Sequence, residues 1–444
     1  AQDDGSKSIC FGMRVLCFLS FIALLIFSVG EARRKWSLTE ARRKLSELAA
    51  TPRVTSFFPK KVHHLVVLQH GLGGNASDWS FFAETLEKLN TGLRWIKSGW
   101  NDKPNGKLVS GKAENIQITF WAPTYNSEAG IDIVGQQLAD DILKRRDEYW
   151  QNGEPIKYLS AIGHSMGGLF LRYAFKSLNE RGAISHGKSA SLLPSNKMQF
   201  RNFFTLATPH LSVWRPNDSF GGFLFNLVAR AMPEPSPQQV SLNDAKFRVG
   251  ADSARQPLLY RMATEEAFMK PLSFFRRGVL YSNVFGDTQV WYESGAIRTH
   301  NPYMGRGSVR PQRHAPFTHM ANNGCRTSNH SVPVKLPYWS SRHPARRGKA
   351  VAHMHKTLNS IVFGKSGWER CDVNIDGSLA TPFREHFSHW LILGIEKGMW
   401  KVEDPAMHVM KNLILGDDTI KNSRHRFQVM MEASRNHVDS FDSR

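Results

Sequence analysis

The feature that most constrains the fold is a glycine-rich run, Gly-His-Ser-Met-Gly-Gly, at residues 163–168. It separates an apolar segment at 157–162, which predicts a strand, from residues 169–178, whose apolar spacing predicts a helix. A strand that turns directly into a helix leaves little room for side chains, and the glycines at 163 and 167 meet that requirement. The sequence therefore predicts a sharp turn that lifts the Ser165 hydroxyl clear of a sheet edge.

Strand and helix patterns alternate on both sides of this run. Short apolar runs rich in β-branched or aromatic residues predict strands at His64–Gln69, Asn115–Trp121, Arg201–Leu206 and Val279–Phe285. Helical spacing of apolar residues predicts helices at Ser80–Leu89 and Ile131–Arg146. This alternation predicts an α/β fold with a mostly parallel central sheet flanked by helices on both faces.

The charge of the chain is unevenly distributed. The formal net charge is +20 over 444 residues, but residues 1–61 carry +6 and residues 294–368 carry 12 basic and no acidic side chains, which leaves +2 for the rest. We therefore divide the chain into an N-terminal apolar and basic segment (1–61), the main part of the folded domain (62–300), a basic insertion expected to be mostly disordered (301–366) and a C-terminal part (367–444).

The basic segments predict the kind of partner. No aromatic-interleaved RNA-binding motif accompanies the basic insertion, so nucleic acid is not an expected partner, and association with an anionic membrane surface is favoured. Residues 15–29 are apolar and uncharged, as in a signal peptide, whereas the basic Arg33-Arg34-Lys35 opposes translocation. A cleaved signal and a membrane anchor both remain open.

The compartment is predicted from weaker features. The four cysteines, Cys10, Cys17, Cys325 and Cys371, supply no disulfide framework and favour a reducing compartment. A glycan on the Asn75-Ala76-Ser77 acceptor site would block access to the adjoining glycine-rich residues 70–74, which favours a protein that faces the cytosol. We expect a membrane-associated protein that faces the cytosol at an endomembrane, with the secretory pathway as the alternative. The sequence does not predict an oligomeric state.

A second glycine-rich loop, His-Gly-Leu-Gly-Gly at 70–74, follows the first predicted strand. In a fold with a nucleophilic serine on a strand-to-helix turn, such a loop supplies a backbone N–H to an oxyanion. The candidate donors are the N–H groups of Leu72 and Met166. Neither phosphate-binding glycine motif occurs, so no nucleotide cofactor is expected, and His353-Met354-His355 alone is too weak a pattern to predict a metal.

Several sequence blocks occur in an order that resembles one family. They are HGLGGNASDW (70–79), AGIDIVGQQLADDI (129–142), GHSMGGLFLRYA (163–174), TLATPHL (205–211), QPLLYRM (256–262) and FFRRGVLYSNVFGDTQVWYESGAIR (274–298). The chain is similar here to the "putative serine esterase" family, a lipase-like branch of the α/β-hydrolases. The similarity covers about 62–300 and resumes near 367–393. The chain departs from the family at the insertion 301–366 and at Ser212, where glycine is usual.

A serine nucleophile of this class needs a carboxylate and then a histidine further along the chain. Asp287 follows the predicted strand Val279–Phe285, and the resemblance assigns the acid to the same residue. Asp244, Asp252 and Asp372 are expected to be surface or turn carboxylates.

The base is harder to predict among 18 histidines. His70, His164 and His210 are expected to be hydrogen-bonded parts of the scaffold, with His164 pointing away from the site. The resemblance places the base at His389, while His386, three residues away, remains open and His437 is a more distant candidate.

The expected function is hydrolysis of lipid acyl esters through Ser165, Asp287 and His389. The apolar segment Phe220–Met232 is either a lid over an acyl pocket or a buried helix. Two alternatives stay open: a lipid acyltransferase that uses the same acyl-enzyme, and a catalytically silent membrane-binding protein.

Overall fold

The computed structural model describes residues 62–83, 94–97, 116–185, 196–213, 231–245, 255–284, 286–301, 318–320, 326–327, 346–375, 388–394, 406, 408–410 and 413. The chain divides into two units, residues 1–57 and 58–444, and every described residue belongs to the second. The predicted signal or anchor at 15–29, most of the predicted lid and the histidines at 386 and 437 therefore lie outside the described residues. In the described part of the chain, no helix has the length and apolarity that a membrane span requires.

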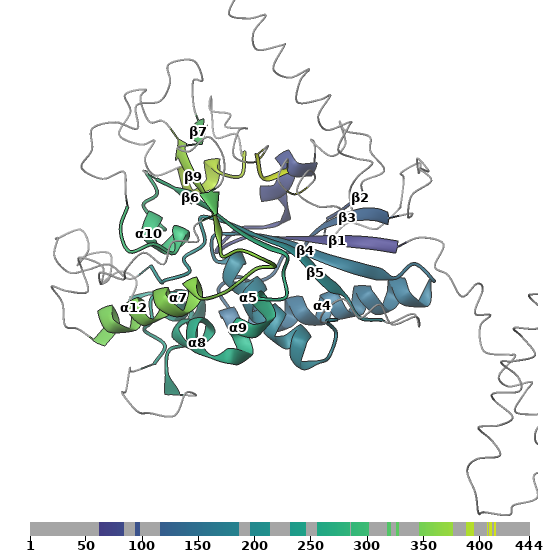
Figure 1. The fold of residues 1–444 in the computed structure, drawn as a ribbon, viewed down its shortest axis with the longest axis horizontal. Coiled ribbons are helices and arrows are strands. Elements are labelled where there is room, and N and C mark those ends of the chain that lie inside the picture. The colour runs from purple at the N-terminus through teal and green to yellow at the C-terminus, as the bar shows by residue number, and fades with distance from the viewer. Residues whose placement is uncertain are drawn as a thin grey trace, which may run out of the picture. The chain divides into compact units, whose positions relative to one another are not determined.

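A nine-stranded sheet forms the centre of the second unit, in the order β2-β3-β1-β4-β5-β6-β9-β7, with β8 also paired to β9 (Figure 1). The strands from β2 to β9 along this order are parallel, and β7 and β8 run antiparallel to β9. Their bounds are β1 Val62–Gln69, β2 Arg94–Lys97, β3 Ile116–Ala122, β4 Ile156–His164, β5 Gln199–Leu206, β6 Arg277–Asn283, β7 Thr318–Met320, β8 Arg326–Thr327 and β9 Glu369–Ile375. The predicted mostly parallel sheet is confirmed.

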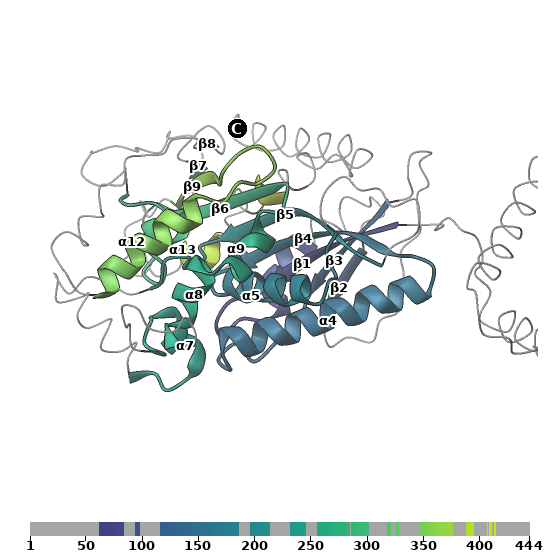
Figure 2. The same cartoon turned by 60° about the horizontal axis from the view of Figure 1, so that its bottom comes forward.

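Helices pack on the sheet because its strands are apolar on both faces. The described helical elements are η1 Ala76–Trp79, α4 Ile131–Gln151, α5 Gly167–Glu180, α7 Pro235–Val240, α8 Leu258–Thr264, α9 Glu266–Leu272, α10 Tyr292–Ala296, α12 Arg346–Asn359 and α13 Ser388–Leu391. Helices α4, α5, α8, α9 and α12 lie along one face, as the two views show (Figures 1 and 2). The opposite core contains Trp79 of η1 and, from the C-terminal part of the chain, Ile392, Leu393, Ala406, Val409, Met410 and Leu413.

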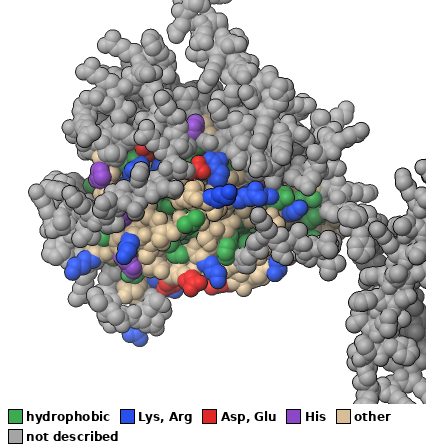
Figure 3. All heavy atoms as spheres, in the orientation of Figure 1, with side chains coloured by type: hydrophobic (Ala, Val, Ile, Leu, Met, Phe, Trp, Pro, Cys, Tyr) green, Lys and Arg blue, Asp and Glu red, His purple; other side chains and the backbone are tan. Residues whose placement is uncertain are grey.

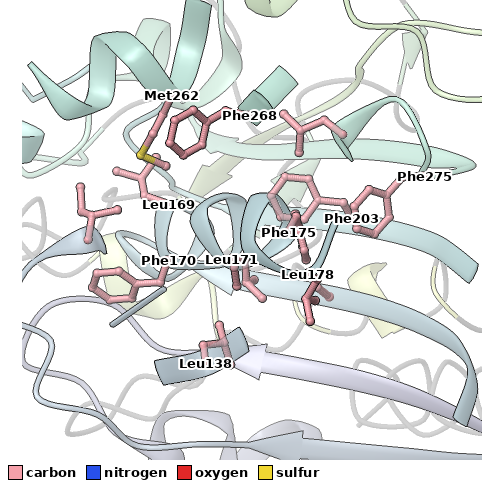
Figure 4. Packing of buried hydrophobic residues seen from close by; sticks show 14 of the residues in the cluster. Leu138, Leu169, Phe170, Leu171, Phe175, Leu178, Phe203, Met262, Phe268 and Phe275 are labelled. Atoms are coloured by element: carbon pink, nitrogen blue, oxygen red, sulfur yellow. The ribbon is translucent and has the colours of Figure 1, made fainter. Parts of the chain in front are cut away.

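Helix α5 lies at the centre of the larger core. It is apolar nearly all round, and it contributes Leu169, Phe170, Leu171, Phe175 and Leu178, which Figure 4 shows among side chains from its neighbours. A helix of this kind is stable only when it is covered on most sides. Burial of the first turn of α5 fixes the start of the helix, which is where the Ser165 turn ends.

The strand order places that turn at a topological switch point. Strands β1 and β4 are neighbours, and from them the chain builds the sheet outward in opposite directions, through β3 and β2 on one side and β5, β6 and β9 on the other. The connections that follow β1 and β4 therefore diverge and leave a crevice at the carboxyl edge of the sheet. Register partners Gln69 and Gly163 bring the ends of these two strands side by side.

The predicted disordered insertion at 301–366 is wrong for its C-terminal part. Residues 346–359 form α12, whose Val351, Met354 and Leu358 are buried in the same core as α5. The indole Nε1 of Trp368 donates to the Leu358 carbonyl at 2.9 Å. The charge count concealed this helix, because its basic residues are exposed or lie at its start while its apolar residues face the core.

Charges on the described surface are mixed. Figure 3 shows Lys and Arg side chains beside Asp and Glu side chains on one face of the molecule. Within the sheet, Arg277 of β6 pairs with Glu369 of β9 through two N–H to carboxylate contacts of 2.8 and 2.6 Å.

Cys371 is disulfide-bonded, although the four cysteines were expected to supply no disulfide framework and to favour a reducing compartment. Its partner lies outside the described residues. Cys371 is fully buried in β9, where Arg326 of β8 pairs with Arg370 and Thr327 pairs with Glu369. In the sequence, Cys325 directly precedes Arg326, and Cys371 directly follows Arg370, the residue with which Arg326 pairs.

We therefore expect non-reducing peptide mapping to recover Cys371 linked to Cys325. A bond that closes a loop of roughly 45 residues stabilises a fold by about 3 to 4 kcal/mol, so reduction is expected to lower the melting temperature of the full chain. The double variant Cys325→Ala/Cys371→Ala serves as the control, because its melting temperature should not respond to reductant. Recovery of Cys371 as a free thiol, or joined to another cysteine, would contradict this prediction.

Candidate active site

Ser165 occupies the turn between β4 and α5. Its backbone is in the left-handed region with φ of +53°, a conformation that non-glycine residues adopt only when the surrounding structure holds them there. The Ser165 N–H donates to the Leu206 carbonyl at 2.8 Å, which ties the turn to the end of β5. The sharp turn predicted from the sequence is thus present, and it projects the serine from the carboxyl edge of the sheet.

The glycines around Ser165 are required by close backbone contacts. A Cβ atom on Gly163 would collide with the backbone of Gly168, and one on Gly167 would collide with the carbonyl oxygen of Gln69. These contacts bring the end of β1, the end of β4 and the start of α5 together. The predicted reason for the glycines at 163 and 167 is confirmed.

The 70–74 loop packs directly against the serine. A Cβ atom on Gly71 would lie 2.6 Å from the Ser165 Cβ and 3.1 Å from its Oγ. His70 fixes the loop by donating from Nδ1 to the Gly71 carbonyl at 2.8 Å and accepting at Nε2 from the Tyr125 N–H at 3.3 Å. Burial lowers the pKa of His70, which keeps the ring neutral and able both to donate and to accept.

The two predicted oxyanion donors flank this contact. Leu72 follows Gly71, and Met166 follows Ser165 at the start of α5. Neither backbone N–H has a hydrogen-bond acceptor among the described residues. Both donors are therefore available to a negatively charged oxygen near the serine.

Asp287 and His389 form a buried pair. The Nδ1 atom of His389 lies 2.9 Å from Oδ2 of Asp287, and the two side chains are 1% and 2% exposed. Asp287 follows β6, and His389 belongs to α13, so two segments 102 positions apart meet at the sheet edge. Because a carboxylate only accepts, the imidazole proton in this contact is on Nδ1.

Three further N–H donors surround the Asp287 carboxylate. Oδ1 accepts from the N–H groups of Gln289 and Val290 at 3.0 and 2.8 Å, and Oδ2 accepts from the amide of Asn283 at 2.9 Å. Burial alone would raise the pKa of Asp287, but the nearby His389 and these hydrogen bonds outweigh burial and hold its pKa below the ordinary value. The carboxylate therefore stays ionised and can orient His389.

The second ring nitrogen of His389 is buried and has no hydrogen-bond partner within the described ranges. A buried polar atom without a partner costs about 1 to 3 kcal/mol of free energy, and a catalytic role is one explanation for such an atom. This Nε2 atom carries no proton when Nδ1 carries it. It is therefore a hydrogen-bond acceptor held ready at the edge of the sheet.

The other candidate histidines have structural partners. His210 lies 3.1 Å from Thr205 Oγ1 through Nε2 and 3.4 Å from Arg172 Nη1 through Nδ1, as expected for a scaffold residue. The expectation that His164 points away from the site is wrong. Its Nε2 donates to the backbone carbonyl of His389 at 2.7 Å, because the end of β4 lies beside α13.

One of the carboxylates expected at the surface is buried. Asp372 of β9 is 1% exposed and accepts a hydrogen bond from the Tyr292 hydroxyl at 2.9 Å, because α10 covers that face of β6 and β9. Asp244 is an exposed turn carboxylate that accepts from the Leu258 N–H at 2.9 Å, as predicted. Residue 252 lies outside the described part.

Across the described ranges, no group of three His, Cys, Asp or Glu side chains is arranged to hold a metal ion. His353 lies instead against the Tyr260 hydroxyl, with 2.8 Å between its Nδ1 and the phenol oxygen.

A family model described as "Putative serine esterase (DUF676)" matches residues 59–300, which is more than half of the chain. The chain belongs to this family. The matched region contains Ser165, Leu72, Met166 and Asp287, whereas His389 lies C-terminal to it. Family membership and the sheet topology together establish an α/β-hydrolase fold.

Two proteins of Saccharomyces cerevisiae are similar to this chain. The chain is 27% identical over 236 residues to the "Putative lipase YDL109C" and 28% identical over 236 residues to the "Putative lipase ROG1". These matches cover 53% and 52% of this chain but only 30% and 28% of the relatives. The chain therefore spans less than a third of the length of either relative.

Solved structures also resemble the chain. The product of the gene lin2722 from Listeria innocua is 17% identical with a TM-score of 0.28, and the match covers 50% of this chain and 71% of that one. Phospholipase PlaB from Legionella pneumophila is 10% identical with a TM-score of 0.27, over 51% of this chain and 39% of that one.

The buried neutral histidines predict acid sensitivity of the fold. Burial, with a smaller effect of His389, lowers the pKa of His164 to about 3, while an unfolded histidine titrates near pH 6.5. Between these pH values the unfolded chain binds more protons than the folded chain, so the free energy of unfolding falls as the pH drops. Burial acts in the same direction on His70, His210 and His355.

We expect urea unfolding to show a free energy of unfolding that declines steadily between about pH 6 and pH 4. The variant His164→Gln removes one such group and should reduce the slope by up to about 1.4 kcal/mol per pH unit. An unchanged slope in this variant would show that His164 is protonated in the folded protein.

Proposed function

We propose that this chain is a serine hydrolase of lipid acyl esters, with Ser165 as nucleophile, His389 as general base and Asp287 as the acid that orients the base. The observation that supports this most directly is the buried hydrogen bond between Asp287 and His389, which leaves Nε2 of His389 without a partner. The second support is that His164, which directly precedes Ser165, donates a hydrogen bond to the backbone carbonyl of His389.

The reaction follows from the proton positions. The Ser165 oxygen attacks the ester carbonyl carbon while Nε2 of His389 accepts the hydroxyl proton, and the resulting imidazolium is stabilised by Asp287. The N–H groups of Leu72 and Met166 donate to the oxyanion. When the tetrahedral intermediate collapses, the carbon–oxygen bond to the alcohol breaks and His389 returns the proton to that oxygen.

A water molecule completes the cycle. His389 accepts a proton from the water as its oxygen attacks the acyl-enzyme, and the Ser165–acyl bond then breaks with return of that proton to the serine oxygen. The products are a free alcohol and a carboxylic acid. The enzyme returns to its starting protonation state.

Two observations support a lipid as the substrate. The yeast relatives carry lipase names. Among the described residues, two of the large apolar side chains exposed to solvent, Leu72 and Trp291, lie on the loops that carry the site, and each is 37% exposed. Apolar side chains beside a polar reaction centre suit a substrate with an acyl chain.

A fluorophosphonate probe tests the nucleophile. We expect the native full-length chain to be labelled and Ser165→Ala not to be labelled, because the probe phosphonylates an activated serine oxygen. His389→Ala is expected to reduce the turnover number for a soluble ester by at least about 10⁴-fold, and Asp287→Asn by a similar factor.

His386→Ala provides the matched control for the base. It is expected to retain labelling and turnover, since the hydrogen bond to Asp287 is made by His389. Equal labelling of native protein and Ser165→Ala would refute the assignment of the nucleophile. Loss of turnover in His386→Ala with activity retained in His389→Ala would reverse the assignment of the base.

The substrate class has its own test, in which dispersed monoacylglycerol is compared with a short water-soluble ester. Trp291→Ala is expected to lower kcat/KM for the dispersed lipid about tenfold, which corresponds to about 1.4 kcal/mol of lost apolar contact, and to leave the short ester unaffected. Val362→Ser is the control, because Val362 is 54% exposed between α12 and β9, away from these loops.

Activity on short esters without activity on dispersed lipid would contradict the lipid assignment. Transfer of the acyl group to an added alcohol without release of free acid would identify an acyltransferase.

A further inference from the structure

His164 connects the nucleophile turn to the predicted base. It is the last residue of β4, it is 2% exposed, and its Nε2 donates to the His389 backbone carbonyl at 2.7 Å. The two imidazole rings lie 4.9 Å apart between centroids. Since a carbonyl oxygen only accepts, Nε2 of His164 carries a proton, and burial lowers the pKa of the ring to about 3 so that it remains neutral.

Asn283 makes a matching connection from β6. Its Nδ2 donates to Oδ2 of Asp287 at 2.9 Å and to the Ser388 backbone carbonyl at 3.2 Å. Both partners only accept, so the NH₂ end of the amide must face them. The Oδ1 atom is buried and lacks a hydrogen-bond partner in the described part of the chain. The amide is thus held as a double donor between the acid and the residue that precedes His389.

Helix α13 cannot orient His389 by itself. It spans only Ser388–Leu391, so its own backbone hydrogen bonds form about one turn. Leu391 and the two residues after the helix, Ile392 and Leu393, anchor it by burial, which is not directional. The hydrogen bonds from His164 of β4 and Asn283 of β6 reach two consecutive carbonyls of this turn, those of His389 and Ser388. Because they come from two different strands, they fix the orientation of the turn.

We propose that His164 and Asn283 are positioning residues for acyl transfer, which hold the backbone at residues 388–389 so that Nδ1 of His389 meets Asp287 and Nε2 stays available to Ser165. This inference rests on the proposed function. It makes the residue before the nucleophile a structural link to the base, and it requires a neutral N–H donor at position 164.

The test compares His164→Leu, which removes the donor, with His164→Gln, which keeps an N–H donor at the end of a side chain of similar length. Provided that fluorophosphonate labels the native chain, we expect His164→Leu to lower kcat for a short ester about 10- to 100-fold with KM unchanged. A displacement of about 1 Å at a reacting group has an effect of this size. His164→Gln should recover most of the loss.

His64→Leu is the matched control. His64 is also fully buried and contacts one neighbouring hydroxyl through Nε2, at 2.8 Å from Ser160 Oγ, but it lies near the start of β1, roughly 20 Å along the sheet from Ser165. We expect this variant to lower the melting temperature and to leave the kcat of the folded protein unchanged. A general effect of losing a buried histidine would instead lower kcat in both leucine variants.

A spectroscopic measurement separates this inference from the proposed function. The proton between Nδ1 of His389 and Asp287 should give a far-downfield ¹H resonance in the native chain, and it should be weakened or lost in His164→Leu and Asn283→Ala but retained in His164→Gln and His64→Leu. This resonance does not depend on turnover. A chain that shows the resonance but hydrolyses no ester would therefore contradict the proposed function and leave the positioning inference standing.

Unchanged kcat and an unchanged resonance in His164→Leu would overturn the positioning role of His164. If that variant does not fold, Asn283→Ala tests the Asn283 half of the proposal by the same two measurements, because it removes the donor to both the Ser388 carbonyl and Asp287 Oδ2. Unchanged kcat and an unchanged resonance in Asn283→Ala would overturn that half.

Discussion

The site depends on a backbone contact, the close approach of the end of β1, the end of β4 and the start of α5. Gly167 lies against the carbonyl of Gln69, and Gly71 lies against Ser165, so the two loops that meet here have no intervening side chains. Because protein interiors are close-packed, any added atom at these positions displaces one of the three elements. The contact sets the conformation of Ser165 and the position of the Leu72 N–H together.

Much of the fold was predictable because its strands are short apolar runs that end in glycine-rich turns. The strands containing Leu65, Phe120, Leu159, Phe203 and Leu280 were all predicted with bounds within a few residues, since burial on both faces of a parallel sheet leaves an apolar signature. Ser165 and the 70–74 loop were predictable because both depend on local sequence. Asp287 was predicted from its place after a strand, with the family resemblance in support, whereas His389 required the resemblance, since nothing local relates residues 102 positions apart.

The features that sequence could not predict are those that depend on distant partners. The orientation of His164 is set by a carbonyl 225 positions away. Asp372 and Arg370 alternate with Cys371 and Val373 along β9, which is typical of a strand with a solvent-facing side, but α10 and α12 cover that side. The core residues of α12 include alanine and methionine between basic residues, so their burial is evident only once α8 lies beside them.

The pairing of β6 with β9 has a consequence for how the chain tolerates change. Asp287 follows β6 and His389 belongs to the segment that follows β9, and the parallel register from Val279 with Glu369 to Asn283 with Val373 fixes the two strands relative to each other. The distance between acid and base is therefore independent of the length of chain that joins the strands. Since doubling a loop adds only about 0.6 kcal/mol of closure entropy, the parts of this connection outside α10, α12, β7 and β8 can change length or sequence while the hydrogen bond between the two side chains persists.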